Sequence, residues 1–194
     1  MIVGITGGIG SGKSVIATQL RDMGYKVYDT DKEAKRLIQE DARIRQKIEA
    51  LLGPSSYKDG VYQTAFVAQQ VFANKDLLAG LNSIVHPAVR DEIQATYKSL
   101  GVQELFFIEC AILYQAKINT LCDKVIGISA PEDIRLERTI ARDNTNADKV
   151  RARMRAQNAE RDLKRCDIVV NNDGKKSIKE LCKEIIDTLL DIKN

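Results

Sequence analysis

The sequence is poor in the residues on which several classes of protein depend. Among 194 residues there is one histidine, and no two of the four cysteines form a CxxC pair. A zinc site built from Cys and His is therefore not expected. The cysteines are expected to be free, buried thiols, as in a reducing compartment such as the cytoplasm. They are Cys110, Cys122, Cys166 and Cys182.

Aromatic residues, net charge and long apolar runs are also scarce. The chain has six tyrosines, four phenylalanines, no tryptophan and a net charge of +3. Nucleic-acid binders usually combine a clustered basic face with aromatic side chains that stack on bases, so no nucleic-acid partner is expected. No apolar run reaches the roughly 18 residues that a membrane-spanning helix needs, and Ile2–Ile5 lacks the preceding basic segment of a signal peptide. We expect a cytoplasmic monomer or weak homo-oligomer.

Short apolar runs alternate along the chain with longer helical patterns. Several runs are apolar throughout, which is typical of parallel strands covered on both faces. The pattern predicts an α/β fold with a doubly wound, parallel five-stranded sheet. From Ile178 to Leu190 one apolar stripe predicts a final helix, which Ser177 and Glu180 begin as a capping box. The expected strands are Ile2–Thr6, Lys26–Tyr28, Leu105–Ile108, Val125–Ile128 and Ile168–Val170.

Two segments interrupt this alternation. Residues 32–103 show helical patterns, a turn at Ser55–Gly60 and no convincing strand, which indicates a helical insertion. Residues 135–165 carry ten Lys or Arg against five Asp or Glu, which favours a short basic lid over bound phosphates. Residues 1–31, 104–134 and 166–194 would then form the core. The helices expected in the insertion are Lys32–Gln39, Ala42–Leu52, Thr64–Phe72, Lys75–Ile84 and Pro87–Leu100.

The segment from Gly7 to Ser14 matches the phosphate-loop pattern GxxxxGK[ST]. Glycines let backbone N–H groups turn toward phosphate oxygens, and the helix that follows points its positive end at the same anion. Lys13 would reach the β- and γ-phosphates of ATP, and the Ser14 hydroxyl would bind Mg²⁺. A dinucleotide loop would need glycine where Lys13 stands. The residues expected to hold ATP here are Gly8, Gly10, Ser11, Gly12, Lys13, Ser14 and Val15.

Acidic residues follow two of the expected strands. Asp29 and Asp31 come after Lys26–Tyr28, expected to be a central strand, and Glu109 follows Leu105–Ile108. A carboxylate at such a strand end can hold Mg²⁺ through water or accept the proton of an attacking hydroxyl. It can equally cap the next helix or turn. For the pair, one Asp can cap while the other acts in catalysis, and either Asp31 or Glu109 would hold Mg²⁺ through water.

His86 and two arginines are further candidates. Pro87 is expected in the first turn of a helix, which would place His86 at a helix N-terminus with a lowered imidazole pKa. The His86 side chain could have a functional role, or it could simply be a packed or capping residue. Arg138 and Arg142 lie one helical turn apart, and guanidinium groups there would stabilise the charge on a transferring phosphoryl group.

Taken together, these residues resemble the dephospho-CoA kinases, and the resemblance covers essentially the whole chain. Its most specific element is Leu81-Asn82-x-Ile84-x-His86-Pro87 after the Asp29-x-Asp31 pair. The other matching motifs are the phosphate loop, the strand that ends at Glu109, Arg138-x3-Arg142-Asp143, Arg153-x3-Gln157 and Cys166-Asp167-x-Val169-Val170-x-Asn172-x-Gly174.

This resemblance implies a P-loop kinase that transfers the ATP γ-phosphoryl group to the ribose 3′-hydroxyl of dephospho-CoA, with Mg²⁺. Asp31 would be the base or the orienter of that hydroxyl. Lys13 and Arg142 would also be catalytic, and Arg142 and Arg138 would belong to the lid. Residues 172–174, including Asn172 and Gly174, would lie against adenine. The insertion would bind the acceptor, with Asp29, Asp31 and His86 facing it.

The sequence departs from the family pattern at one place, where Gln115 replaces the usual acidic residue, and no role is transferred to that position. The exchange of a usual alanine for Cys166 is of little consequence. The alternative functions are another small-molecule P-loop kinase, of nucleoside monophosphate or shikimate type, and a non-catalytic nucleotide switch. A guanine-reading motif is not expected, because Asn74-Lys75-Asp76 has the wrong spacing.

Overall fold

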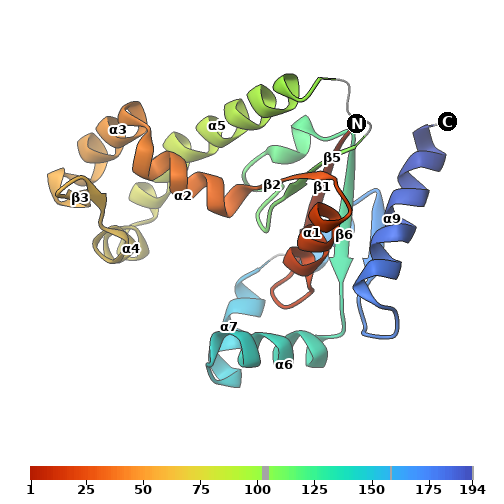
Figure 1. The fold of residues 1–194 in the computed structure, drawn as a ribbon. Helices are drawn as coiled ribbons and strands as arrows, with labels where there is room; N and C mark the ends of the chain where they lie inside the picture. Colours follow the sequence, from red (N-terminus) through yellow and green to blue (C-terminus); the bar gives the residue numbers. More distant parts are fainter. Residues whose placement is uncertain (102–104, 158, 194) are drawn as a thin grey trace. The chain divides into compact units, whose positions relative to one another are not determined.

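The computed structural model describes residues 1–101, 105–157 and 159–193 (Figure 1). The chain forms two compact units. The first, here called the sheet unit, contains Met1–Tyr28 and Val102–Asn194, and the second, the helical unit, is Asp29–Gly101. The expected boundary between residues 103 and 104 lies outside the described residues.

Five strands of the sheet unit form one sheet in the order β2-β5-β1-β6-β7. β1 pairs in parallel with β5 and β6, and β6 pairs in parallel with β7. The expected parallel five-stranded α/β fold is confirmed. The strands are β1 Ile2–Gly7, β2 Lys26–Asp29, β5 Phe106–Glu109, β6 Lys124–Ser129 and β7 Ile168–Asn171.

The strand order places a ligand-binding crevice at the carboxyl end of β1. From β1 the chain crosses to β2 at one edge, and later adds β6 on the other side of β1. In such sheets ligands bind where the strand order reverses, beyond the carboxyl ends. The expectation that Lys26–Tyr28 is a central strand was wrong, because β2 is an edge strand. Its short apolar run, Val27–Tyr28, does not distinguish an edge position from a central one.

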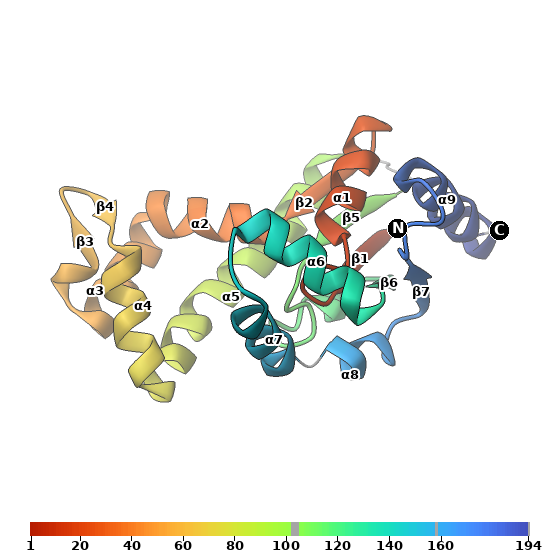
Figure 2. The same cartoon turned by 90° about the horizontal axis from the view of Figure 1, so that it is seen from below.

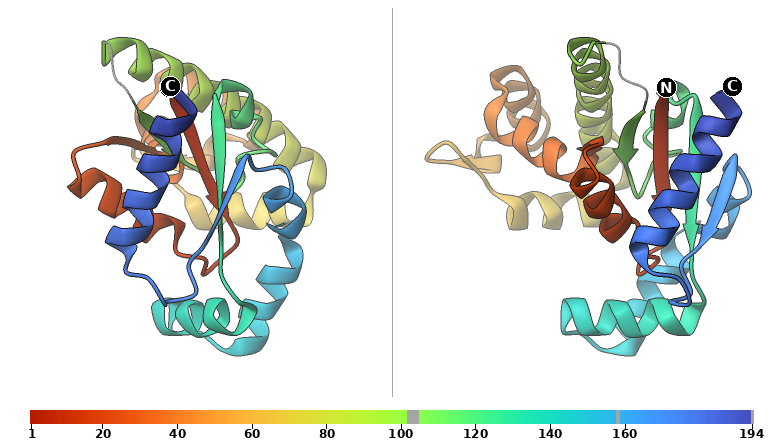
Figure 3. Two further views of the ribbon diagram at one scale, coloured as in Figure 1. Left: turned by 90° about the vertical axis from the view of Figure 1, so that its right-hand side faces the viewer. Right: turned by 45° about the vertical axis from the view of Figure 1, so that its right-hand side comes forward.

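Helices α1 (Lys13–Asp22) and α9 (Ile178–Lys193) pack together over one face of the sheet (Figure 3). Their buried residues, such as Leu20 and Ile185, join β-strand residues such as Ile5 in one core cluster. The predicted capping box of α9 is confirmed. The Ser177 backbone N–H donates to Glu180 Oε2 at 2.8 Å, and the Glu180 N–H donates to Ser177 Oγ at 3.2 Å.

The opposite face of the sheet is covered so closely that two strand positions require glycine. A Cβ on Gly4 would lie 2.6 Å from Leu113 Cδ1, and one on Gly127 would lie 2.6 Å from Leu163 Cδ2. Leu163 ends the short helix α8 (Ala159–Leu163). The remaining elements of the sheet unit are η2 Ile118–Leu121, α6 Glu132–Asp143 and α7 Ala147–Ala156.

All four cysteines are free thiols. Cys110 and Cys182 are buried as expected, whereas Cys122 and Cys166 are only partly buried, so the expectation of buried thiols holds for two of the four. Burial raises the pKa of the Cys122 thiol to about 12. None of the described helices has the length and apolar character that a membrane crossing requires.

The helical unit also contains a small hairpin. Strands β3 (Tyr57–Lys58) and β4 (Val61–Tyr62) pair antiparallel, so the expectation of no strand in this region was wrong. Asp59 and Gly60 both have positive φ, 51° and 80°, as a two-residue Asp-Gly hairpin turn requires. The other elements are α2 Thr30–Glu40, α3 Ala42–Leu52, η1 Pro54–Ser56, α4 Thr64–Ala73 and α5 Lys75–Ser99.

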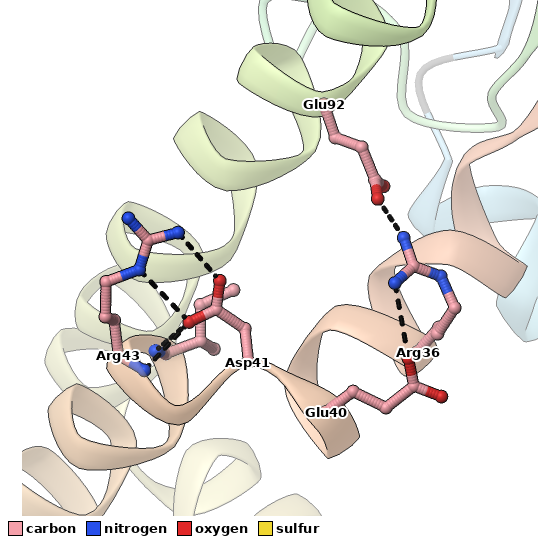
Figure 4. Close-up of polar contacts among 6 residues, drawn as sticks. Arg36, Glu40, Asp41, Arg43 and Glu92 are labelled. Carbon is pink, nitrogen blue, oxygen red and sulfur yellow. Dashed lines mark hydrogen bonds and ion pairs between the residues drawn. The ribbon is translucent and has the colours of Figure 1, made fainter.

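Polar contacts join the helices of this unit. Figure 4 shows Arg36 of α2 directed at Glu92 of α5, with a second contact, 3.3 Å long, from Arg36 to Glu40. It also shows Asp41 at the start of α3, where its carboxylate accepts from the backbone N–H of Arg43 at 2.8 Å. Of these contacts, Arg36–Glu92 joins two helices, and its side chains are 39% and 24% exposed. Such partly solvated ion pairs orient helices and contribute little stability.

Helix α5 runs without a break from Lys75 to Ser99, with Pro87 in its interior. The expectation of two helices, the second beginning at Pro87, was therefore wrong. A proline within a helix removes one backbone hydrogen bond and usually ends or bends the helix. Here Val85, Val89 and Ile93 are buried at four-residue spacing on both sides of Pro87, and this packing offsets the lost hydrogen bond.

Candidate active site

The phosphate loop lies between the end of β1 and the start of α1, and it depends on glycine at two positions. Gly10 and Gly12 have φ of 76° and 92°, in the left-handed region. A Cβ on Gly12 would lie 2.2 Å from Asn172 Nδ2, and one on Gly10 would lie 2.3 Å from the Arg135 carbonyl oxygen. Gly12 is the N-cap residue of α1, and no side chain among the described residues caps this helix. The helix therefore presents its positive end to an anion.

A cavity of about 440 Å³ opens beside this loop. It brings together most residues that the sequence assigned to ATP, and Arg142 besides. Gly8, Ser11 and Gly174 do not line it. Ile178 does, although the sequence placed it only in the apolar stripe of α9. The lining residues are Gly10, Gly12, Lys13, Ser14, Val15, Arg138, Arg142, Asn172 and Ile178.

Asn172 holds the loop from the end of β7. Its side chain is 2% exposed, and its Nδ2 donates to the Ser11 carbonyl oxygen at 2.9 Å. Arg138 Nη1 donates to the Asn172 carbonyl oxygen at 3.0 Å. The contact that the structure shows for Asn172 is thus with the phosphate loop, whereas the sequence predicted one with adenine. Ser11 is also buried, and its Oγ has no hydrogen-bond partner among the described residues.

Ser14 and Glu109 meet beside the loop. Ser14 Oγ donates to Glu109 Oε1 at 2.8 Å, and Glu109, the last residue of β5, is only 8% exposed. The pair supplies a hydroxyl and a carboxylate, the oxygen donors that Mg²⁺ prefers. Across residues 1–101, 105–157 and 159–193, no three His, Cys, Asp or Glu side chains cluster as a metal site. A magnesium ion here would therefore rest on these two residues, phosphate oxygens and water.

The described part of residues 135–165, which the sequence predicts to be a lid and which is here called the lid segment, contacts the loop. Figure 2 shows its helices α6, α7 and α8 from below. Arg142 on α6 donates from Nε to Asp143 Oδ1 at 2.7 Å, and Arg153 on α7 donates to Asp143 Oδ2 at 2.6 Å. Hydrogen bonds from Arg142 and then Arg153 hold the pKa of the Asp143 carboxyl well below its usual range. Asp143 thus stays charged between the two arginines.

The acidic pair divides into a capping residue and an exposed one. Asp29 is the N-cap of α2, and its Oδ1 accepts from the Lys32 backbone N–H at 3.0 Å. Asp31 lies in the first turn of α2 and is exposed. The sequence left open which of the two residues caps the helix. The structure shows that Asp29 does so and that Asp31 does not.

His86 lies inside α5, so the expected position at a helix N-terminus was wrong. Its imidazole pKa is nonetheless lowered, first by burial and then by the charge of Arg90, which lies one helical turn further on. The direction matches the expectation, but the helix dipole is not the cause.

The folded protein is expected to lose stability as pH falls below about 6.5, in part through His86. The unfolded chain takes up a proton near that pH, whereas the folded chain does so only at lower pH, because its imidazole pKa is lowered. Urea unfolding at pH 5 and pH 8 should show this loss, at most about 1.4 kcal/mol per pH unit from one group. His86→Gln should reduce the pH dependence, and an unchanged dependence would contradict the assignment. His86 is the only histidine in the chain.

Gln115 acquires a partner in the structure. Its Nε2 donates to Asp162 Oδ2 at 3.0 Å, and Asp162 on α8 is 8% exposed. Gln115 itself is exposed, but an acidic residue there would bring a second carboxylate beside the buried Asp162, which is unfavourable. The amide at position 115 therefore suits Asp162, and the departure from the family pattern has a structural explanation.

Two residues that the sequence did not single out as ligands touch the loop. Arg135 Nε donates to the Ile9 carbonyl oxygen at 2.9 Å, and Gln157 Oε1 accepts from the Ile9 backbone N–H at 2.8 Å. Gln157 belongs to the motif Arg153-x3-Gln157, which marked the residue as part of the family resemblance but did not predict its contact with Ile9. Arg135 was counted only as part of the basic segment.

A phosphate loop after the first strand of a parallel sheet, with Ser14 and Glu109 beside it, defines a P-loop kinase. The family model for dephospho-CoA kinase matches residues 1–178. The chain belongs to this family, and it is an ATP-dependent kinase. The family match does not favour the alternative acceptors or a non-catalytic switch.

Known relatives agree with this assignment. The chain is 42% identical over 161 residues to the dephospho-CoA kinase of Porphyromonas gingivalis, covering 83% of this chain and 79% of the relative. It matches the crystal structure of TT1252 from Thermus thermophilus with a TM-score of 0.83 and 31% identity, over 98% and 97% of the two chains. The dephospho-CoA kinase from Campylobacter jejuni shares the fold, with a TM-score of 0.73 and 24% identity over 100% and 98%.

Proposed function

We propose that this chain transfers the γ-phosphoryl group of ATP to the ribose 3′-hydroxyl of dephospho-CoA, with Asp31 as the base and Mg²⁺ bound at Ser14 and Glu109. The observation that carries the proposal is the 440 Å³ cavity, in which loop glycines, Lys13 and Ser14 face Arg138 and Arg142. Such a site offers donors and positive charge to a triphosphate from several sides.

The residues around the cavity have separate tasks. Lys13 neutralises the β- and γ-phosphates, and the uncapped start of α1 offers backbone N–H groups to the same oxygens. Arg138 and Arg142 stabilise negative charge on the equatorial oxygens of the γ-phosphoryl group during its transfer. When bound, Mg²⁺ supplies further charge neutralisation. Catalysis then depends mainly on positioning and electrostatics.

Asp31 is proposed as the group that accepts the proton of the acceptor hydroxyl. It follows the last residue of β2 by two positions, and its carboxylate is exposed in the first turn of α2. Asp29 already caps this helix, so Asp31 is the member of the pair left to act on substrate. We assign acceptor binding to residues 32–103, including His86, and lid closure to residues 135–165.

The position of the new phosphate tests this reaction. After incubation of the protein with ATP, Mg²⁺ and dephospho-CoA, phosphorus–proton correlation NMR of the product should connect the added phosphorus to the ribose 3′ proton. A product phosphorylated elsewhere would overturn the proposed acceptor hydroxyl. ATP hydrolysis without a phosphorylated acceptor would overturn the transfer itself.

Glu109→Gln is expected to raise the Mg²⁺ concentration for half-maximal activity by about 10-fold or more. Glutamine can still accept the Ser14 hydrogen bond, so the variant removes the charge while keeping the contact. The measurement is initial rate at fixed ATP across a Mg²⁺ titration. An unchanged Mg²⁺ dependence would show that Glu109 does not contribute to the metal site.

A further inference from the structure

The peptide groups on both sides of Ile9 are held by side chains from the lid segment. The Ile9 N–H donates to Gln157 Oε1 at 2.8 Å, across 148 residues of sequence, and the contact is partly buried. The Ile9 carbonyl oxygen accepts from Arg135 Nε at 2.9 Å, across 126 residues. Gln157 is the C-cap of α7, and Arg135 lies on α6.

These two contacts orient successive peptide planes of the phosphate loop. The N–H of Ile9 belongs to the peptide that joins Gly8 to Ile9, and its carbonyl belongs to the peptide that joins Ile9 to Gly10. Because a trans peptide is planar, its C=O and N–H point in opposite directions. Arg135, by holding the Ile9 carbonyl, therefore also fixes the direction of the Gly10 N–H, and Gly10 lines the 440 Å³ cavity.

We propose that Gln157 is a positioning residue for phosphoryl transfer: together with Arg135 it sets the phosphate loop in the orientation that places the γ-phosphate for attack. The proposal rests on the proposed function. Its consequence is that the ends of the lid helices and the loop move as one body, so the loop reaches its productive geometry only when α6 and α7 are in place.

The chemistry of Gln157 fits this role. Its amide oxygen is a neutral acceptor, so it satisfies the Ile9 N–H without adding negative charge beside a triphosphate. A carboxylate would accept the same hydrogen bond but repel the phosphates. A thioether of similar length would fill the space and leave the N–H without a good acceptor. Glutamate and methionine at position 157 therefore separate hydrogen bonding from packing.

The test compares Gln157→Met with Gln157→Glu in steady-state assays of the full chain with ATP, Mg²⁺ and dephospho-CoA. Gln157→Met is expected to lower kcat by about 10- to 100-fold, because displacement of catalytic geometry by about 1 Å has effects of that size. Gln157→Glu should recover most of kcat and raise the KM for ATP. Gln19→Met, the same change at a partly exposed position of α1 that is assigned neither to ATP, the acceptor nor the lid, is the matched control and should leave both constants unchanged.

Three outcomes would overturn the proposal. Equal impairment of both Gln157 variants would indicate a packing role, and wild-type kcat in Gln157→Met would show that the contact is dispensable. If Gln157→Met does not fold, hydrogen exchange of the Ile9 amide in the wild-type protein decides the question. We expect protection with and without a non-hydrolysable ATP analogue, and rapid exchange in the complex would overturn the proposal. An inactive wild-type protein would instead refute the proposed function.

Discussion

Asp31→Asn is expected to lower kcat by about 10²- to 10⁴-fold while ATP binding is retained, because a positioned general base contributes rate enhancement of that order. Asparagine has nearly the same shape but cannot take the proton of the acceptor hydroxyl. Asp31 caps no helix, since Asp29 is the N-cap of α2, so the change should not affect folding. Steady-state rates with dephospho-CoA and calorimetric titration of ATP separate the two effects.

Asp41→Asn is the matched control for this variant. Asp41 caps α3 and accepts from the backbone N–H groups of Arg43 and Ile44. Asparagine caps about as well as aspartate, so Asp41→Asn should keep stability and should lower kcat far less than Asp31→Asn does. Full activity in Asp31→Asn would remove Asp31 from the mechanism, and equal losses in both variants would point to a general effect of lost charge in the helical unit.

Gly12→Ala is expected to weaken ATP binding by about 10- to 100-fold, because a displaced loop loses hydrogen bonds to charged phosphates, each contributing about 1.5–3 kcal/mol. The new Cβ would lie 2.2 Å from Asn172 Nδ2, so either Asn172 gives up its hydrogen bond to the Ser11 carbonyl oxygen or the loop shifts. The φ of 92° at Gly12 is itself strained for alanine. Calorimetric titration with a non-hydrolysable ATP analogue and Mg²⁺ measures the loss.

The variant Gly24→Ala separates the effect of the steric clash with Asn172 from the effect of placing alanine in a left-handed backbone conformation. Gly24 also has a φ of 92°, but a Cβ there would meet nothing within 4 Å. This variant should lose about 1–2 kcal/mol of stability from the left-handed backbone and bind ATP normally. Normal ATP binding by Gly12→Ala would show that the Asn172 contact does not hold the loop in its binding conformation.

The sheet and the phosphate loop could be predicted from the sequence because their signals are local. Strands such as Val125–Ile128 are apolar throughout, since both faces of a parallel strand are covered. The loop motif is a run of eight residues whose spacing is set by backbone geometry alone. The Ser177 and Glu180 capping box was visible for the same reason.

Features that depend on packing between distant segments could not be predicted in this way. Pro87 gave a local signal for the start of a helix. In the structure α5 continues past Pro87, with Val85 and Val89 buried on either side of it. The hairpin at Asp59 and Gly60 has a recognisable turn, yet each of its strands has only two residues, too few to show alternation.

Residues of the candidate site were predicted individually, but the hydrogen bonds between them were not. Asn172 donates to the loop across 161 residues, Gln157 accepts from it across 148, and Ser14 reaches Glu109 across 95. No periodicity or motif spacing encodes such pairs, because they arise only when the strands are ordered in the sheet. The roles of Asp31, His86 and Arg142 therefore remain predictions, and Asp31→Asn tests the first of them.

Release of ADP by the wild-type protein, with ATP and Mg²⁺ and with or without dephospho-CoA, tests the central claim most directly. The account predicts slow release without acceptor, strong stimulation by dephospho-CoA, and a product heavier than dephospho-CoA by one phosphate. Normal ATP binding with no stimulation and no added phosphate would contradict it.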